Sequence, residues 1–139
     1  MLDLIIKNGS CYIDKNLKIQ DIAVKDGKIV EIGKITDETK EIFDAKNLTV
    51  LPGCIDTQTH FREPGSTDTE DLHSGSKAAI AGGITGVFEM PNTNPPTSNK
   101  LEFQKKLDLA KNRMYCNYAF YFGATADNGN ELADIKNLE

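Results

Sequence analysis

The stretch that decides the fold is Leu51-Pro52-Gly53-Cys54-Ile55-Asp56-Thr57-Gln58-Thr59-His60-Phe61-Arg62-Glu63-Pro64-Gly65. A Pro-Gly break opens it, residues 54–60 are strand-like, and a second Pro-Gly pair ends it. Because alternate side chains of a strand point the same way, Asp56, Gln58 and His60 are expected on one face. At the carboxyl end of a barrel strand, that face looks into the mouth where active sites lie. We therefore expect this stretch to carry functional residues.

Strand-like and helix-like segments alternate downstream of this stretch. We expect strands at residues 54–60, 84–90 and 115–124, and helices at residues 69–81, 98–113 and 131–138. Gly82-Gly83 is expected to stop the first helix and Ser98 to cap the second. This alternation predicts parallel strands with right-handed crossovers. A complete barrel takes eight such units and about 250 residues. Residues 53–139 are therefore expected to be the first three β/α units of an α/β fold, a (β/α)8 TIM barrel that this chain leaves incomplete.

Residues 1–52 are expected to form a separate small β module. Its candidate strands are residues 2–6, 11–13, 20–24, 28–32, 41–44 and 48–51. Asn8-Gly9 and Asp26-Gly27 are two-residue turn signals between pairs of these strands. Apolar residues alternate as in a sheet with one buried face, for example Ile22 and Val24. The module has few large apolar residues, which predicts a small core.

Composition and charge restrict the class of protein. The chain has 21 acidic and 16 basic residues and a net charge of −5, which disfavours binding to nucleic acid. The basic cluster Lys100, Lys105, Lys106 and Lys111 is interspersed with acidic residues and predicts a solvated helix face. Three widely spaced cysteines without a paired motif indicate reduced thiols. Since no leader and no apolar run of about 18 residues is present, we expect a cytoplasmic protein that does not enter the membrane.

Two motifs resemble a known family. The stretch from Cys54 to Gly65 is similar to the first barrel strand of the amidohydrolase superfamily, whose signature there is His-x-His, and resembles dihydroorotase in particular. Phe88-Glu89-Met90-Pro91-Asn92-Thr93-Asn94-Pro95 resembles the Met-Pro-Asn-Thr motif that follows that family's second strand. Hydantoinase and allantoinase relatives do not usually carry arginine at the position of Arg62, so the two motifs together favour dihydroorotase. The resemblance implies a metal-dependent barrel preceded by a small β-sandwich module.

The resemblance also implies an activity and site residues. The family reversibly hydrolyses dihydroorotate to carbamoyl aspartate in pyrimidine biosynthesis, with one or two Zn²⁺ ions that activate water. It implies that His60 is a metal ligand and that Arg62 and Asn92 bind the substrate carboxylate. Gln58 stands where the family has its first metal-binding histidine, and an amide is a poorer zinc ligand than imidazole. No catalytic residue is expected in this segment, because the aspartate base is expected downstream. The 139-residue chain alone is therefore expected to be inactive and to bind zinc weakly at most.

Each candidate residue also has a simpler interpretation. Arg62 would serve equally as an ion-pair partner of Glu63 or Asp56. Asn92 lies between turn-prone segments and would serve as a turn former. His73 stands at a helix start without neighbouring candidates and is expected to be a surface residue.

Two other functions fit the same motifs. Loss of a metal-binding histidine at Gln58 is what a non-catalytic dihydroorotase-like subunit would show, one that scaffolds aspartate transcarbamoylase. A different cyclic amidohydrolase, hydantoinase- or allantoinase-like, is disfavoured by Arg62 and Asn92. The expected partners are a small-molecule substrate and further copies of the protein in a homo-oligomer.

Overall fold

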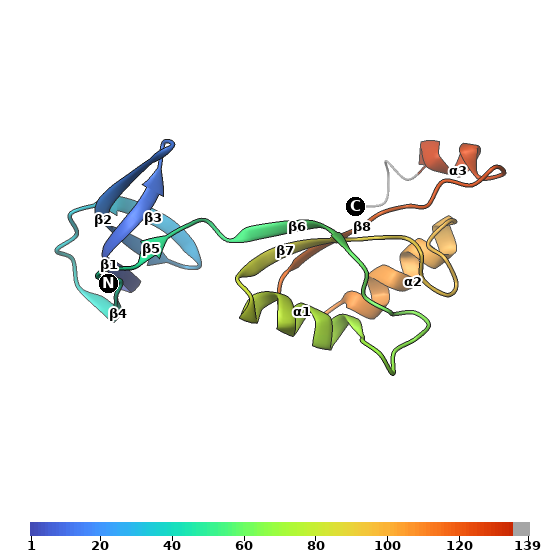
Figure 1. Cartoon of the computed structure of the whole chain (residues 1–139), viewed down its shortest axis with the longest axis horizontal. Coiled ribbons are helices and arrows are strands. Elements are labelled where there is room, and N and C mark those ends of the chain that lie inside the picture. The colour runs from blue at the N-terminus through green and yellow to red at the C-terminus, as the bar shows by residue number, and fades with distance from the viewer. Residues whose placement is uncertain (135–139) are drawn as a thin grey trace. The chain divides into compact units, whose positions relative to one another are not determined.

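The computed structural model describes residues 1–134 of the chain (Figure 1). The contacts divide the chain into two compact units, Met1–Pro52 and Gly53–Glu139. None of the helices in the described residues is long and apolar enough to cross a bilayer.

The first unit is a five-stranded sheet of mixed direction. Its strands are β1 (Leu2–Ile13), β2 (Asn16–Lys25), β3 (Lys28–Gly33), β4 (Thr39–Asp44) and β5 (Thr49–Val50). The order is β3-β2-β1-β4, with β5 also paired to β1. β1 is antiparallel to β2, and β2 to β3, whereas β4 and β5 run parallel to β1. The long strand β1 is therefore the centre of the unit.

The two turn signals of the first unit behave differently. Asp26-Gly27 forms the predicted hairpin between β2 and β3, with φ of 50° and 71° at its two residues. Asn8-Gly9 does not separate two strands. β1 runs through it with a register shift between Ile6 and Gly9, so the predicted turn is a bulge. The turn from β1 to β2 lies at Asp14-Lys15, where both residues adopt positive φ without a glycine to signal it.

The core of the first unit is small, as expected. Ile5, Ala23 and Ile35 form its buried apolar cluster, and Leu2 packs against them. Cys11, Ile22 and Ala45 are also buried. Apolar residues on the outer strands remain exposed, for example Ile29, which is 61% exposed. Every residue of β3 except Gly33 is exposed, so the described residues cover neither face of this strand.

The second unit has the predicted alternation of parallel strands and helices. Its strands β6 (Cys54–Thr59), β7 (Ile84–Glu89) and β8 (Asn117–Phe120) form a parallel sheet in the order β6-β7-β8. Its helices are α1 (Leu72–Ala81), α2 (Lys100–Ala110) and α3 (Gly129–Asp134). The sheet is open and three-stranded, so the described residues show part of an α/β fold and no closed barrel.

Local capping explains why the first two helices begin later than predicted. Asp71 caps α1: its carboxylate accepts a hydrogen bond from Ser74 N, and the Ser74 hydroxyl oxygen accepts one from Asp71 N. Asn99, rather than the predicted Ser98, caps α2 by accepting a hydrogen bond from Glu102 N. The helix expected at residues 131–138 begins earlier, at Gly129, and its predicted final residues lie outside the described part of the chain.

The third strand is shorter than the predicted residues 115–124. β8 ends at Phe120, because the following backbone turns to other partners. Tyr121 N still donates to the carbonyl of Glu89 (2.9 Å), but Gly123 N donates to the carbonyl of Thr97 (2.8 Å) in the loop between β7 and α2. The chain after β8 therefore supports that loop.

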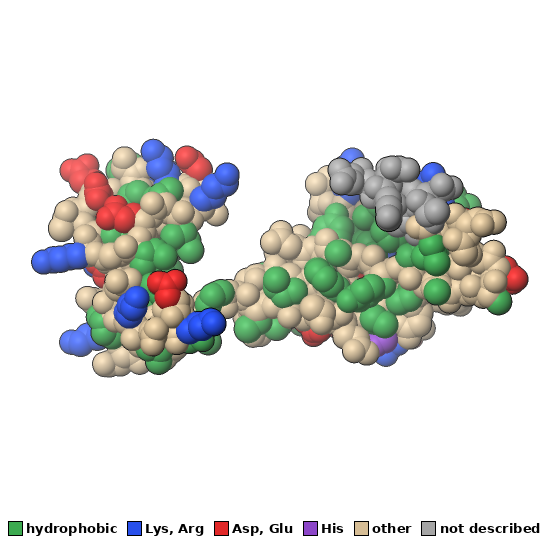
Figure 2. Space-filling view, turned by 90° about the horizontal axis from the view of Figure 1, so that it is seen from above, with side chains coloured by type: hydrophobic (Ala, Val, Ile, Leu, Met, Phe, Trp, Pro, Cys, Tyr) green, Lys and Arg blue, Asp and Glu red, His purple; other side chains and the backbone are tan. Residues whose placement is uncertain are grey.

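Helices α1 and α2 cover one face of the sheet β6-β7-β8 (Figure 1). The core between these layers contains Phe61, Leu72, Val87, Phe103, Ala110, Cys116 and Phe120. Seen from above, the second unit shows gathered apolar side chains (Figure 2). Ile55 and Phe88 are 62% and 38% exposed and line a shallow cavity of about 140 Å³ with Asn117.

Candidate active site

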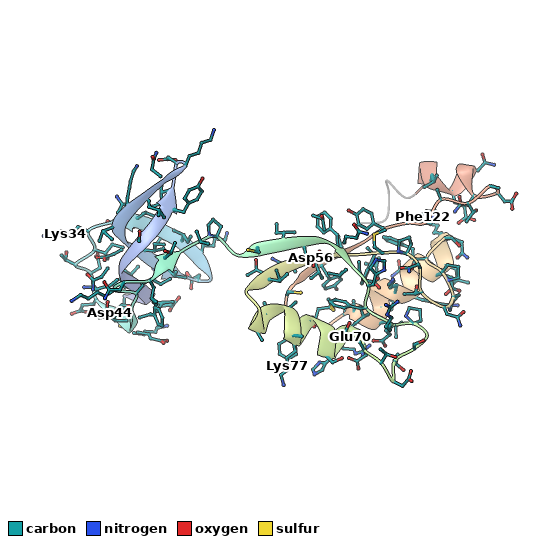
Figure 3. All side chains as sticks on the ribbon, in the orientation of Figure 1. Lys34, Asp44, Asp56, Glu70, Lys77 and Phe122 are labelled. Atoms are coloured by element: carbon teal, nitrogen blue, oxygen red, sulfur yellow. The ribbon has the colours of Figure 1, made fainter. Side chains whose placement is uncertain are left out.

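The loops after β6 and β7 lie side by side. Parallel strands present their carboxyl ends at the same edge of a sheet, so these two loops emerge together. Asn94 N donates to the carbonyl of Pro64 across the contact (3.0 Å). Gly65 has φ of 128°, and a Cβ there would lie 3.2–3.3 Å from atoms of Asn94. The close approach of the loops therefore depends on this glycine. Figure 3 marks β6 by Asp56 and the loop after it by Glu70.

The structure brings Arg62 and Asn92 to one cavity of about 120 Å³ between the two loops. The remaining lining residues are Phe61, Pro64, Ser66, Thr93 and Asn94. Amides, hydroxyls and one guanidinium make up most of its polar groups. The cavity therefore suits a small polar group.

His60 belongs to the same site. Its Nδ1 lies 2.9 Å from Oδ1 of Asn92; an amide oxygen only accepts, so this is a hydrogen bond when Nδ1 carries the proton. A histidine whose Nδ1 carries the proton has its other ring nitrogen, Nε2, as an acceptor. Asn92 therefore favours the tautomer of His60 that is protonated at Nδ1 and is more than the turn former of the simpler interpretation.

Arg62 does not take either ion-pair partner that the sequence offered. The Glu63 carboxylate is bound by Arg113 through two hydrogen bonds, of 2.8 and 3.0 Å. Asp56 accepts a hydrogen bond from the backbone of Gln58 (2.9 Å). Arg62 is exposed, and within residues 1–134 no carboxylate lies at ion-pair distance from it. Its guanidinium is therefore available to an anionic or polar ligand in the cavity.

Glu63 and Arg113 are structural residues that the sequence did not single out. Glu63 is buried and also accepts a hydrogen bond from Leu72 N (3.0 Å). The hydrogen bonds of Glu63 raise the pKa of Arg113 above its ordinary value, which keeps the guanidinium charged. The pair fixes the loop that carries Arg62 to the residues just after α2. His73 is exposed beside the ring of Tyr115, as predicted for a surface residue.

The predicted metal ligands do not form a metal site by themselves. Gln58 is exposed, and a register shift between Asp56 and Thr59 interrupts the alternation that predicted one common face. Among the described residues, no group of three or more histidine, cysteine, aspartate or glutamate side chains is placed to hold an ion. A catalytic zinc ion needs three protein ligands. One imidazole and one amide do not fit that requirement, so binding of zinc by His60 and Gln58 stays a prediction.

A buried ion pair lies beneath the site. Glu89, the last residue of β7, contacts Lys106 of α2, and both side chains are completely buried. The predicted solvated face is thus wrong for Lys106, which lies on the buried stripe of α2 between Phe103 and Ala110. Burial raises the pKa of Glu89 to about 7, against the opposing effects of Lys106 and Arg62. Burial also lowers the pKa of Lys106, against the favourable effect of Glu89.

The sequence contained a signal for this pair. Glu89 is a charged residue at the end of an apolar strand, and Lys106 stands at helical spacing from Phe103 and Ala110. Charged residues in buried positions are nearly always paired. Two such residues of opposite charge on neighbouring elements therefore predict an internal ion pair.

Comparisons with known proteins agree with this architecture. The model of the amidohydrolase family matches residues 49–137. Allantoinase of Escherichia coli O1:K1 / APEC is 40% identical over 134 residues, which are 96% of this chain and 30% of the relative. L-hydantoinase (dihydropyrimidinase) from Arthrobacter aurescens superposes with a TM-score of 0.91 at 31% identity, over 99% of this chain and 31% of that one. D-hydantoinase (dihydropyrimidinase) from Thermus sp. superposes with a TM-score of 0.76 at 29% identity, over 95% of this chain and 30% of that one.

These relatives limit what the motifs predicted. The chain spans about 30% of the length of the relatives that it matches. They are allantoinases and hydantoinases, so the finer prediction of a dihydroorotase stays a prediction. The match to the family model covers more than half of the chain, including both loops of the candidate site. The chain therefore belongs to the amidohydrolase family.

Proposed function

We propose that the full-length protein is a cyclic amidohydrolase that opens a ring of the allantoin or hydantoin type. The observation that carries this proposal is the convergence of His60, Arg62 and Asn92 at the carboxyl ends of β6 and β7. The similarity to allantoinase and hydantoinase supports the same class of reaction. The function predicted as an alternative from the sequence is thus the better supported one.

The three residues suit hydrolysis of a ring amide. Addition of water to the carbonyl carbon places negative charge on the carbonyl oxygen, and cleavage of the C–N bond then requires a proton on the departing nitrogen. The Arg62 guanidinium and the Asn92 amide offer donors to a ring oxygen from the walls of one cavity. His60, with Nε2 as its acceptor, can hold a proton beside them. Together they would bind and orient a planar, polar ring.

Hydrolysis of dihydroorotate is the second candidate, and Arg62 is the observation that favours it. The guanidinium has no acidic partner within the described residues, and its planar fork matches a carboxylate. Dihydroorotate has a ring carboxylate, whereas allantoin and unsubstituted hydantoin have none. An available arginine in the cavity therefore favours a substrate that carries an anionic group.

The test compares ring amides on the purified full-length protein. The substrates are allantoin, hydantoin, dihydroorotate and dihydrouracil, the last of which has hydrogen in place of the carboxylate of dihydroorotate. We expect ring opening of at least one of them. Absence of turnover on all four would refute the proposed class of reaction.

The variant Arg62→Met separates the two candidates. If the carboxylate is bound, kcat/KM for dihydroorotate should fall by roughly tenfold or more, because hydrogen bonds to charged groups contribute about 1.5–3 kcal/mol. The loss on dihydrouracil should be much smaller, and Asn92→Ala should cost less than Arg62→Met. Lys77→Met, which removes an exposed cation from α1, is the matched control and should change neither value. Equal losses on both rings would show that Arg62 holds the loop rather than the substrate.

A further inference from the structure

Lys106 reaches both ends of the loop that carries Asn92. Its Nζ lies 3.3 Å from the carbonyl oxygen of Met90, directly after β7, and 3.3 Å from Oγ1 of Thr97, shortly before α2. Its third contact is the carboxylate of Glu89. A lysine ammonium has three donors, so each of them has an acceptor here. No other described side chain contacts both ends of this loop by hydrogen bonds.

The far end of the loop is tied through Thr97, which is 1% exposed. Thr97 N donates to the carbonyl of Pro91 (2.9 Å), which closes the loop on itself. The hydroxyls of Thr93 and Thr97 lie 3.4 Å apart, and the carbonyl of Thr97 accepts from Gly123 N (2.8 Å). Thr97 is thus the residue where the loop, α2 and the segment after β8 meet: its hydroxyl contacts Lys106 of α2, and its carbonyl accepts from Gly123 N.

Stability alone does not account for a buried ion pair at this place. Removing two charges from water costs about as much as their attraction returns, and apolar pairs of similar volume are often equally stable. One oxygen of Glu89, Oε1, has no donor among the described residues, so the pair is incompletely hydrogen-bonded. An apolar side chain at position 106 would fill the space but could not hold a carbonyl and a hydroxyl together.

We propose that Lys106 is a positioning residue: by joining Met90 to Thr97 it closes the 90–97 loop and fixes the place of Asn92 in the candidate site. Glu89 supplies the third acceptor for the buried ammonium. The loop reaches the site through Asn92, which bonds to His60 (2.9 Å) and lines the cavity with Arg62, and Thr93 and Asn94 line the same cavity. The proposal rests on the proposed function only in giving Asn92 a substrate to bind.

The first test measures the loop without any substrate. In the full-length protein, the double variant Glu89→Leu with Lys106→Met replaces the ion pair by apolar groups and should keep a thermal midpoint close to that of the wild type. Hydrogen exchange at the amides of Asn94 and Thr97 should nevertheless be at least about tenfold faster. The amide of Leu72, which donates to Glu63 in the other loop, is the internal control and should not change. Unchanged exchange at Asn94 and Thr97 in a folded double variant would overturn the proposal.

A second variant serves if the double variant does not fold. Thr97→Val keeps the ion pair and nearly the same volume, but removes the hydroxyl that accepts from Lys106. We expect faster exchange at Asn94 in this variant as well. Exchange equal to the wild type would show that the Lys106 contact does not hold the loop.

Kinetics then test whether Lys106 acts through Asn92. With the ring amide that the wild type opens, the double variant should raise KM by about tenfold with a smaller change in kcat, and should have little further effect in the Asn92→Ala background. Additive losses in the two backgrounds would overturn an action through Asn92. If the wild type opens no ring amide, the proposed function fails, while the exchange experiment still decides the role of Lys106.

Discussion

The two loops of the candidate site are held by two cations that differ in burial. Arg113, just after α2, binds Glu63 of the first loop, and these side chains are 35% and 10% exposed. Lys106, within α2, binds Glu89 beneath the second loop, and both side chains are fully buried. Because solvent screens the first pair, its strength comes mainly from the bidentate hydrogen bonds between the guanidinium and the carboxylate. The second pair is unscreened and costly to break, because either partner alone would be a buried charge.

The two ion pairs also hold their loops in different ways. The Arg113 pair fixes a turn from outside, through Glu63 and the Leu72 amide that Glu63 also accepts. The Lys106 pair closes a loop from inside, by contacts at both of its ends. The buried pair should therefore contribute more to the free energy of unfolding and act more directly on the site. Substitutions of Lys106 and Arg113 should differ in how much stability they cost and in which loop they loosen.

The largest effect is expected for Lys106→Met alone. This change leaves Glu89 buried without its cation, which should lower the free energy of unfolding by about 3–5 kcal/mol. Urea denaturation of the full-length protein measures the loss. The neighbouring Lys105→Met is the matched control, since Lys105 pairs with Glu102 on the surface (2.8 Å) and should contribute less than about 1 kcal/mol. Equal losses for the two lysines would mean that the pair of Lys106 is hydrated in solution.

A smaller effect is expected from pH. The pKa of Glu89 is raised to about 7 by burial, from an ordinary value of 4.5. The folded protein therefore keeps a proton that the unfolded chain releases between these values, and stability should fall as pH rises from about 5 to about 7. The fall should amount to roughly 2–3 kcal/mol at most. It should be absent from Glu89→Gln, and urea midpoints at pH 5 and pH 8 give the comparison. A Glu89→Gln variant with the same pH dependence as the wild type would assign the fall to other groups.

Much of the fold was predictable because it follows from local patterns. The break at Pro52-Gly53, the alternation after it and the Asp26-Gly27 hairpin all agree with the structure. The errors arose where tertiary contacts override a local signal. Asn8-Gly9 is a bulge because β1 pairs with its neighbours on both sides of it. The turn falls on Asp14-Lys15, which lacks the glycine of the Asp26-Gly27 hairpin.

The candidate site was predictable from the motifs, and its supports were predictable only in part. His60, Arg62 and Asn92 come together as the positions of two parallel strands require. Lys106 was predicted on a solvated face although it stands at helical spacing from Phe103 and Ala110, and no prediction was made for Arg113. Their acidic partners lie 17 and 50 residues earlier in the chain, a separation that spacing rules for helices and strands do not reach.

The smallest of these effects is expected for Arg113→Met. The pair with Glu63 contributes two charge-assisted hydrogen bonds, but Arg113 is partly exposed and water can solvate what the substitution leaves behind. Glu63 also keeps its hydrogen bond from Leu72 N, so its carboxylate does not become an isolated buried charge. We therefore expect a loss of about 1–2 kcal/mol in the free energy of unfolding, measured by urea denaturation of the full-length protein. Hydrogen exchange should rise at Leu72 and stay unchanged at Thr97, the reverse of the result expected for Lys106. Faster exchange at Thr97 in Arg113→Met would instead show that the two loops move as one body. The Asn94–Pro64 hydrogen bond and the close contact at Gly65 would then couple the loops to each other. That coupling would be stronger than the hold of either ion pair on its own loop.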